Sequence, residues 1–500
     1  MLESLRNRWE TQPLNVILFA ALLFRLVSAI FSKGYGMHDD HFLVIEAAQS
    51  WIDGFDYNHW LPENRPDGIP TGHSFFYVGL HYLFFRLLEL LGVFDPQLKM
   101  LFVRVIHALL SLLTVKYGYK ITERLWGIEN AKVVGLLLGL LWFYPVLSVR
   151  NMVEMVCVPF ALLAYWQLID KKGMKRFVIA GLFIGISMGV RVQMYLIFGG
   201  LGLALLIRKE IIEAFVFGLS AIFALFITQL TDLMLWGKPF AEMIQYVLYN
   251  STHYDDYIAQ SWFQYFIVIT GLLIPPISLF LWFGFFKNWK KNLLFFLPVV
   301  IFFLFHSFYP NKQERFILPI LPFFIILGVT GWNEFRTNSN YWNNHKSLYK
   351  GFVSFFWIIN IMALLFVTGA YTKRSRVESM VYLKNRGDAK GIFLERSTNH
   401  GCYLMPRFYL DNWDGYHYCY DKGQAGKIED QELKNIIVQR NVKYFLFIED
   451  ENVEQRVEEI KKKSFDLEFL KKIEPSYLDK LLYFLNPRNQ NEVIFIYHIP

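Results

Sequence analysis

The chain has 500 residues, of which 54% are hydrophobic and 18% aromatic, and its formal net charge is +7. A soluble domain is about 45–50% apolar, so this composition excludes an ordinary soluble protein. The basic residues stand in short clusters between apolar runs, which is typical of membrane topology and not of nucleic-acid binding. We therefore expect a protein with several membrane spans, membrane lipids around it and no nucleic-acid partner.

A spanning helix needs about 20 mainly apolar residues to cross a ~30 Å hydrocarbon core. Eleven segments meet this requirement, near 13–31, 98–120, 131–149, 152–170, 175–190, 192–208, 211–236, 262–286, 290–309, 315–332 and 351–372. A further apolar segment, 73–94, contains His81, Arg86 and Glu89, and it either spans the membrane or lies along its surface.

The distribution of Lys and Arg decides how segment 73–94 is read. If it lies in the interface, the basic loops, such as the one containing Lys171 and Lys172, all fall on the cytoplasmic side. If it spans, every later loop changes side and the bias reverses. We therefore predict an interfacial 73–94, a cytoplasmic N-terminus and a long outer loop over 32–97. The first apolar run is long and lacks a small-residue cleavage pattern, so we expect a retained span and not a signal peptide.

The composition becomes charged and mixed after Tyr371. Short β-rich runs such as "VKYFLFIED" alternate with polar helical stretches such as "EDQELKNIIVQRN", a pattern typical of a small α/β domain. We predict a helical membrane module over 1–372 and an α/β domain over 373–500 on the outer face. Cys402 and Cys419 share this domain and either pair or remain free.

Two adjacent carboxylates follow the first span, in the stretch "GYGMHDDHFLVIEAAQSW". Asp39 and Asp40 stand between His38 and His41. A carboxylate held at the membrane boundary near cations is suited to act as a general base on a hydroxyl group. The alternatives are a solvated loop and a metal site. The metal site is less favoured because the side chains of adjacent residues rarely all point at one ion.

Cations gather in three other stretches on the predicted outer face. Arg150 and Glu154 in "YPVLSVRNMVEM" stand four residues apart, as in an intrahelical ion pair, and Arg150 is alternatively a phosphate ligand. Arg191 is either a boundary anchor or a phosphate ligand. The short loop in "HSFYPNKQERFILPILPF" contains the last three charged residues of interest, Lys312, Glu314 and Arg315. These cations either extend from a helix end to the membrane surface or bind an anionic lipid phosphate.

Together these stretches resemble the GT-C superfamily of polytopic glycosyltransferases, and within it glycosyltransferase family 22. In "DDHFLVIEAA", Asp39 and Asp40 match the family's acidic pair and Glu46 its later acid. "SVRNMVE" matches a second family stretch, and "NKQERFILPILP" resembles a third, with Asn311 and Gln313 in place of the family's His and Glu. The resemblance covers about residues 12–332.

The resemblance implies a GT-C fold and an inverting transfer of a sugar, in the first instance mannose, from a polyprenyl-phosphate donor to a hydroxyl of a glycolipid or glycan acceptor. In this hypothesis Asp39 is the general base and Asp40 supports it. The donor phosphate is bound by Arg191, Lys312 and Arg315, and the cleft is lined by Glu46, Arg150, Glu154 and Glu314. The reaction needs no nucleotide and, as we read it, no metal cofactor.

Two alternatives for the function stay open from the sequence, and the location has two readings. The acceptor is a protein or a lipid A-type lipid if the chain belongs to another branch of the superfamily. A transporter or lipid flippase is the rival from another class, and Arg25 and Asp232, embedded in apolar runs, support it best. The expected location is a bacterial inner membrane with a periplasmic C-terminal domain, or the endoplasmic reticulum membrane in a eukaryote.

Overall fold

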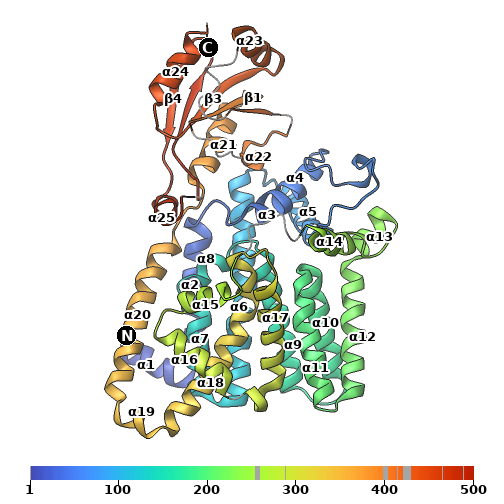
Figure 1. Ribbon diagram of the computed structural model, residues 1–500, viewed down its shortest axis with the longest axis vertical. Coiled ribbons are helices and arrows are strands. Elements are labelled where there is room, and N and C mark those ends of the chain that lie inside the picture. The colour runs from blue at the N-terminus through green and yellow to red at the C-terminus, as the bar shows by residue number, and fades with distance from the viewer. Residues whose placement is uncertain are drawn as a thin grey trace. The chain divides into compact units, whose positions relative to one another are not determined.

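The computed structural model describes residues 2–253, 260–287, 289–397, 404–413, 415–420, 429–463, 465–487 and 489–500. The chain divides into two compact units, which we treat separately. The helical unit comprises Met1–Ile30, His59–Leu80 and Leu101–Gly369, and the sheet unit comprises Phe31–Asn58, His81–Met100 and Ala370–Pro500. Figure 1 traces both along the chain from blue to red.

Long apolar helices make up most of the helical unit and run side by side (Figure 1). The helices that lie wholly or partly in the helical unit are α1 (Leu2–Thr11), α2 (Pro13–Phe31), α5 (Phe75–Leu90), α6 (Pro96–Trp126), α7 (Ile128–Leu140), α8 (Tyr144–Ser148), α9 (Val153–Asp170), α10 (Lys175–Val190), α11 (Tyr195–Ile207), α12 (Ile211–Thr228), α13 (Leu230–Trp236), α14 (Ala241–Thr252), α15 (Gln264–Leu272), α16 (Ile277–Lys287), α17 (Leu293–Phe308), α18 (Leu321–Asn338), α19 (Asn340–Asn344) and α20 (Lys346–Thr368). Short 3₁₀ turns, η3 (Val192–Met194) and η5 (Glu314–Ile320), precede α11 and α18.

Seven helices in the described part of the chain are long and apolar enough to cross a membrane, or eight if α15 and α16, bent by 118°, count as one broken span. The seven are Pro13–Phe31, Pro96–Trp126, Val153–Asp170, Ile211–Thr228, Trp289–Phe308, Glu314–Asn338 and Lys346–Thr368. Helices also occupy the other predicted segments, but α7, α10 and α11 have 13, 16 and 13 residues. The count of eleven spans and the interfacial position of α5 remain predictions.

A row of glycines lets two helices of the helical unit approach closely. Gly181, Gly185 and Gly189 follow one another at four-residue spacing on α10 and face α12. A Cβ atom on Gly185 would lie 2.3 Å from the backbone oxygen of Ala221, a distance that no packed carbon tolerates. Close backbone approach at small residues is the usual way in which apolar helices associate where lipid removes the hydrophobic driving force.

We predict that Gly185→Ala destabilises the helical unit by about 1–3 kcal/mol, because the new methyl group forces α10 away from α12. The measurement is the thermal unfolding midpoint in detergent. Gly199→Ala on α11 is the matched control, since a Cβ there meets nothing within 4 Å. Equal midpoints for the two variants would contradict the packing argument.

The sheet unit is built around a five-stranded mixed sheet of order β2-β1-β3-β5-β4. β1 pairs in parallel with β2 and β3, whereas β5 pairs antiparallel with β3 and β4. Its strands are β1 (Gly391–Arg396), β2 (Tyr416–Tyr420), β3 (Val442–Ile448), β4 (Glu468–Ile473) and β5 (Ile494–His498). Its helices are α3 (His38–Asp40), α4 (Ala47–Ile52), α21 (Arg374–Arg386), α22 (Arg407–Leu410), α23 (Asp430–Gln439), α24 (Val453–Lys461) and α25 (Tyr477–Leu485), with a π-helix, η1 (His41–Glu46), between α3 and α4.

The alternation of strands and helices agrees with the α/β pattern predicted after Tyr371, and the core packs Phe393, Phe445 and Phe447 against Leu433 and Ile460. The grouping of segments differs from the predicted division at residue 372. Residues 32–58 and 81–97 of the predicted outer loop belong to the sheet unit. Glu46 and Phe85 contact Phe408, and Asp53 accepts a hydrogen bond from Trp413, and such distant pairings are not visible in the sequence. Cys402 lies outside the described residues.

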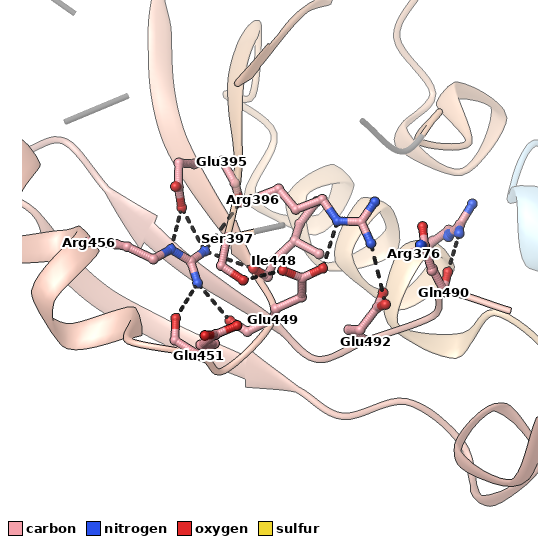
Figure 2. A network of polar contacts seen from close by, with 10 residues as sticks. All are labelled: Arg376, Glu395, Arg396, Ser397, Ile448, Glu449, Glu451, Arg456, Gln490 and Glu492. Atoms are coloured by element: carbon pink, nitrogen blue, oxygen red, sulfur yellow. Dashed lines mark hydrogen bonds and ion pairs between the residues drawn. The ribbon is translucent and has the colours of Figure 1, made fainter. Parts of the chain in front are cut away.

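Two buried arginines tie the carboxyl ends of β1 and β3 together (Figure 2). Arg456 of α24 donates to Glu395 Oε2 at 2.7 Å and to the backbone oxygen of Ile448 at 2.7 Å. Arg396 donates to Glu449 Oε1 at 2.7 Å. Burial raises the pKa of Glu395, and the charge of Arg456 opposes that shift. The carboxyl ends of the parallel strands β1 and β3 lie next to each other, and these ion pairs connect them.

We predict that Arg456→Ala destabilises the sheet unit by about 3–5 kcal/mol, because Glu395 is left as an uncompensated buried charge. Hydrogen exchange of peptides from β1 and β3 measures the effect. Lys461→Ala is the control on the same helix, since Lys461 pairs with Glu458 at the surface and such pairs contribute at most about 1 kcal/mol. Unchanged exchange in the Arg456 variant would show that the network is not needed for the sheet.

Candidate active site

The acidic pair begins a helical segment of the sheet unit. α3, the π-helix η1 and α4 follow one another without a gap from His38 to Ile52. Asp39 and Asp40 therefore lie in its first turn, where unpaired backbone N–H groups favour negative charge. Asp39 is half-buried, and Asp40 is 3% exposed. The two carboxylates thus have different environments although they are neighbours in sequence.

His41 and Glu46 support this segment from inside the sheet unit. Both side chains are fully buried, with His41 Nε2 3.4 Å from Glu46 Oε1. The imidazole ring lies stacked on Tyr35 at 4.6 Å and on Tyr409 at 5.4 Å between ring centroids. Glu46 Oε1 accepts the backbone N–H of Phe408 at 3.0 Å. This placement favours a structural role for Glu46 over the predicted contact with substrate.

The partner residues Tyr409 and Phe408 were not foreseen from the sequence, because Phe408 and Glu46 are 362 positions apart. A signal was nevertheless present, since Glu46 interrupts an apolar run and a buried acid needs a partner. Within the described ranges, no group of three or more His, Cys, Asp and Glu side chains could hold a metal ion.

A second charged cluster lies within the helical unit, around the carboxylate of Glu154. Arg191 Nη1 donates to Glu154 Oε1 at 2.5 Å, and Arg315 Nε lies 3.5 Å from the same oxygen. Glu154 is 1% exposed, Arg191 5% and Arg315 6%. Three elements contribute, since Glu154 is in the first turn of α9, Arg191 follows α10 and Arg315 is on η5.

The ring of Phe316 lies beneath both guanidinium groups, 5.4 Å from Arg191 and 5.6 Å from Arg315. Nε and Nη2 of Arg191 have no hydrogen-bond partner among the residues that the structure describes. Two guanidinium groups share the carboxylate of Glu154, and Arg315 Nε also donates to Gln313 Oε1 at 2.8 Å. The open buried donors of Arg191 form a site that an anion would complete.

Lys312 and Glu314 flank this cluster in sequence with different surroundings. Lys312 Nζ donates to the backbone oxygens of Tyr309 at 2.7 Å and Gln260 at 3.0 Å, and burial lowers the pKa of its ammonium group. Glu314 is exposed at the start of η5. Backbone oxygens therefore hold the ammonium group of Lys312, which is three residues before Arg315 in the chain. Glu314 is at the surface.

Of the two readings of Arg150, the intrahelical pair with Glu154 is wrong. α8 ends at Ser148 and α9 begins at Val153, so Arg150 lies in a non-helical connection and the four-residue spacing has no helical meaning. The carboxylate of Glu154 pairs instead with arginines from later in the chain. Arg150 itself is 4% exposed.

The two charged residues that supported a transporter have structural partners in the helical unit. Arg25 donates to Ser111 Oγ and to the backbone oxygen of Gly139, each at 2.8 Å. Asp232 Oδ2 accepts the backbone N–H of Glu242 at 2.9 Å. These contacts explain both residues as links between chain segments, which removes the main support for the transporter alternative.

Comparison with known proteins gives the same assignment as the motifs. Residues 16–400 match the model of the Alg9-like mannosyltransferase family, which confirms the resemblance to glycosyltransferase family 22. GPI mannosyltransferase 3 of Yarrowia lipolytica is 26% identical over 324 residues, 61% of this chain and 60% of that protein. Mannosyltransferase APTG1 of Arabidopsis thaliana is 26% identical over 333 residues, 63% of this chain and 58% of that protein. The chain thus spans about three fifths of these relatives.

Solved structures extend the similarity to nearly the whole chain. ArnT from Cupriavidus metallidurans bound to undecaprenyl phosphate aligns with a TM-score of 0.58 at 13% identity, covering 96% of this chain and 97% of ArnT. The apo form of ArnT aligns with a TM-score of 0.59 at 13% identity, covering 98% of each chain. At this identity the likeness shows the fold alone. The chain is an integral membrane protein of the GT-C fold and belongs to the Alg9-like mannosyltransferase family.

Proposed function

We propose that this protein transfers mannose from a polyprenyl-phosphate donor to a hydroxyl group of a glycolipid or glycan, with inversion at the anomeric carbon. The observation that carries the proposal is the buried cluster of Arg191, Arg315 and Glu154, in which Nε and Nη2 of Arg191 have no hydrogen-bond partner among the described residues. Membership of a mannosyltransferase family supports the sugar. The undecaprenyl phosphate bound to ArnT, a protein of the same fold, supports a polyprenyl-phosphate donor.

The cluster suits a phosphate that leaves with its negative charge. A guanidinium group offers donors in a planar fork, and in a water-excluded site such donors stabilise charge that develops on oxygen. Glu154 holds Arg191 and Arg315 near each other against their repulsion. We propose that Lys312 adds a further cation. With cations from side chains at the leaving phosphate, the reaction needs no metal.

The attacking hydroxyl group needs a base, because a neutral hydroxyl is a weak nucleophile. We propose that Asp39, the half-buried member of the pair, takes this proton and that the buried Asp40 supports its position. The phosphate leaves as an anion and requires no acid, so a single carboxylate base is sufficient. We further propose that transfer occurs on the outer face of the membrane.

We predict that Asp39→Asn lowers kcat by about 10²–10⁴-fold, the usual contribution of a positioned general base. The assay is transfer from polyprenyl-phosphate mannose by purified protein in detergent. Asp67→Asn is the matched control, because Asp67 is a half-exposed acid that pairs with Arg65. Activity of the Asp39 variant within a few-fold of the control would exclude this base.

We predict that Arg191→Lys raises the KM for the donor by about 10- to 100-fold, because one charge-assisted hydrogen bond is worth about 1.5–3 kcal/mol. The lysine keeps the charge opposite Glu154 but loses the fork that would bind phosphate oxygens. Arg208→Lys is the control, since Arg208 is 44% exposed and pairs with Glu210 at the surface. An unchanged donor KM in the Arg191 variant would place the phosphate elsewhere.

A further inference from the structure

The last helix of the sheet unit, α25, exposes large apolar side chains. Phe484 is 82% exposed, Leu485 68% and Leu481 39%. Single exposed apolar residues are common on protein surfaces and need no explanation, but three on one short helix do. The proposed transfer reaction assigns no role to this helix.

These side chains lie on one face of α25. At about 100° per residue, Leu481, Phe484 and Leu485 fall within one third of a turn. Asp479 lies on the opposite face and is 1% exposed. Its carboxylate joins Ser476 in a capping box at the start of the helix. The helix is therefore amphipathic, with its polar anchor inside the unit and its apolar face outside.

Hydrogen bonds connect α25 to the end of a membrane span. Asp479 accepts the backbone N–H groups of Lys373 and Arg374, at 2.9 and 3.2 Å. The neighbouring Thr372 donates its backbone N–H to the oxygen of Lys33 at 3.2 Å. Lys33 is two residues beyond Phe31, the last residue of the candidate span α2.

These links fix how far α25 can lie from the hydrocarbon boundary. Two residues reach about 7 Å at full extension, and the two hydrogen bonds and one further residue add about 10 Å. All of the linking residues, from Phe31 to Asp479, belong to the sheet unit. Asp479 is thus held within roughly 15–20 Å of a span end, a range that includes the headgroup region.

We propose that α25 is an interfacial helix that inserts Leu481, Phe484 and Leu485 among phospholipid acyl chains. A lipid surface fits better than a protein partner, because the face is apolar, narrow and tethered to the end of a span. Lys480, 59% exposed at its side chain, borders this face and suits the phosphate level of the interface.

The test places photoreactive benzoylphenylalanine at position 484 of the full-length protein in nanodiscs of phosphatidylethanolamine and phosphatidylglycerol. After irradiation, mass spectrometry identifies what is bound to the chain. Val438 on α23 is the matched control site, because it is 79% exposed and belongs to the same unit, while its exposed neighbours on that helix are polar. A second probe at Leu485 guards against loss of folding at one site.

We expect phospholipid adducts at positions 484 and 485 that exceed those at 438 several-fold. Adducts no more abundant than at 438, or a crosslink between two copies of the chain, would overturn the proposal. Transfer activity, measured on the same samples, distinguishes this proposal from the proposed function, since the lipid contact stands whether or not the protein transfers mannose.

Discussion

The buried carboxylate of Glu154 holds two arginines, Arg191 and Arg315, together inside the helical unit. Removing charges from water is costly, and the buried Arg191 and Arg315 are both compensated by this one anion. The position of Arg191 also depends on helix packing, since it directly follows α10, whose glycines allow contact with α12. The glycines of α10 therefore also influence where Arg191 lies.

Apolar length and strand alternation were sufficient to predict the main elements. Each predicted apolar segment contains a helix, and the charged segment after Tyr371 contains the sheet. Local pattern failed where the chain departs from regular geometry. The connection between α8 and α9 removes the helical relation of Arg150 and Glu154, and no periodicity in the sequence reveals such a break.

The candidate site was predictable in its residue types but not in its partners. The motifs pointed to Asp39 and Arg315, the position of Arg191 between two apolar runs pointed to that residue, and the structure places the carboxylate of Glu154 against both arginines. That Tyr409 stacks on His41 could not be inferred, because a contact across hundreds of residues leaves no trace in one sequence. Long-range pairing is set by the fold as a whole, and an acid in an apolar run signals only that some partner exists.

The division into units has a consequence for how this chain can be cut or recombined. The backbone passes between the helical unit and the sheet unit five times, at Ile30, Asn58, Leu80, Met100 and Gly369. A protein truncated at Gly369 would keep the acidic pair. It would lose the ring of Tyr409, which stacks on His41, and the backbone N–H of Phe408, which binds Glu46. The segment after Gly369 therefore packs against the residues that carry Asp39 and Asp40. Exchanging it between homologues would require exchanging residues 31–58 with it.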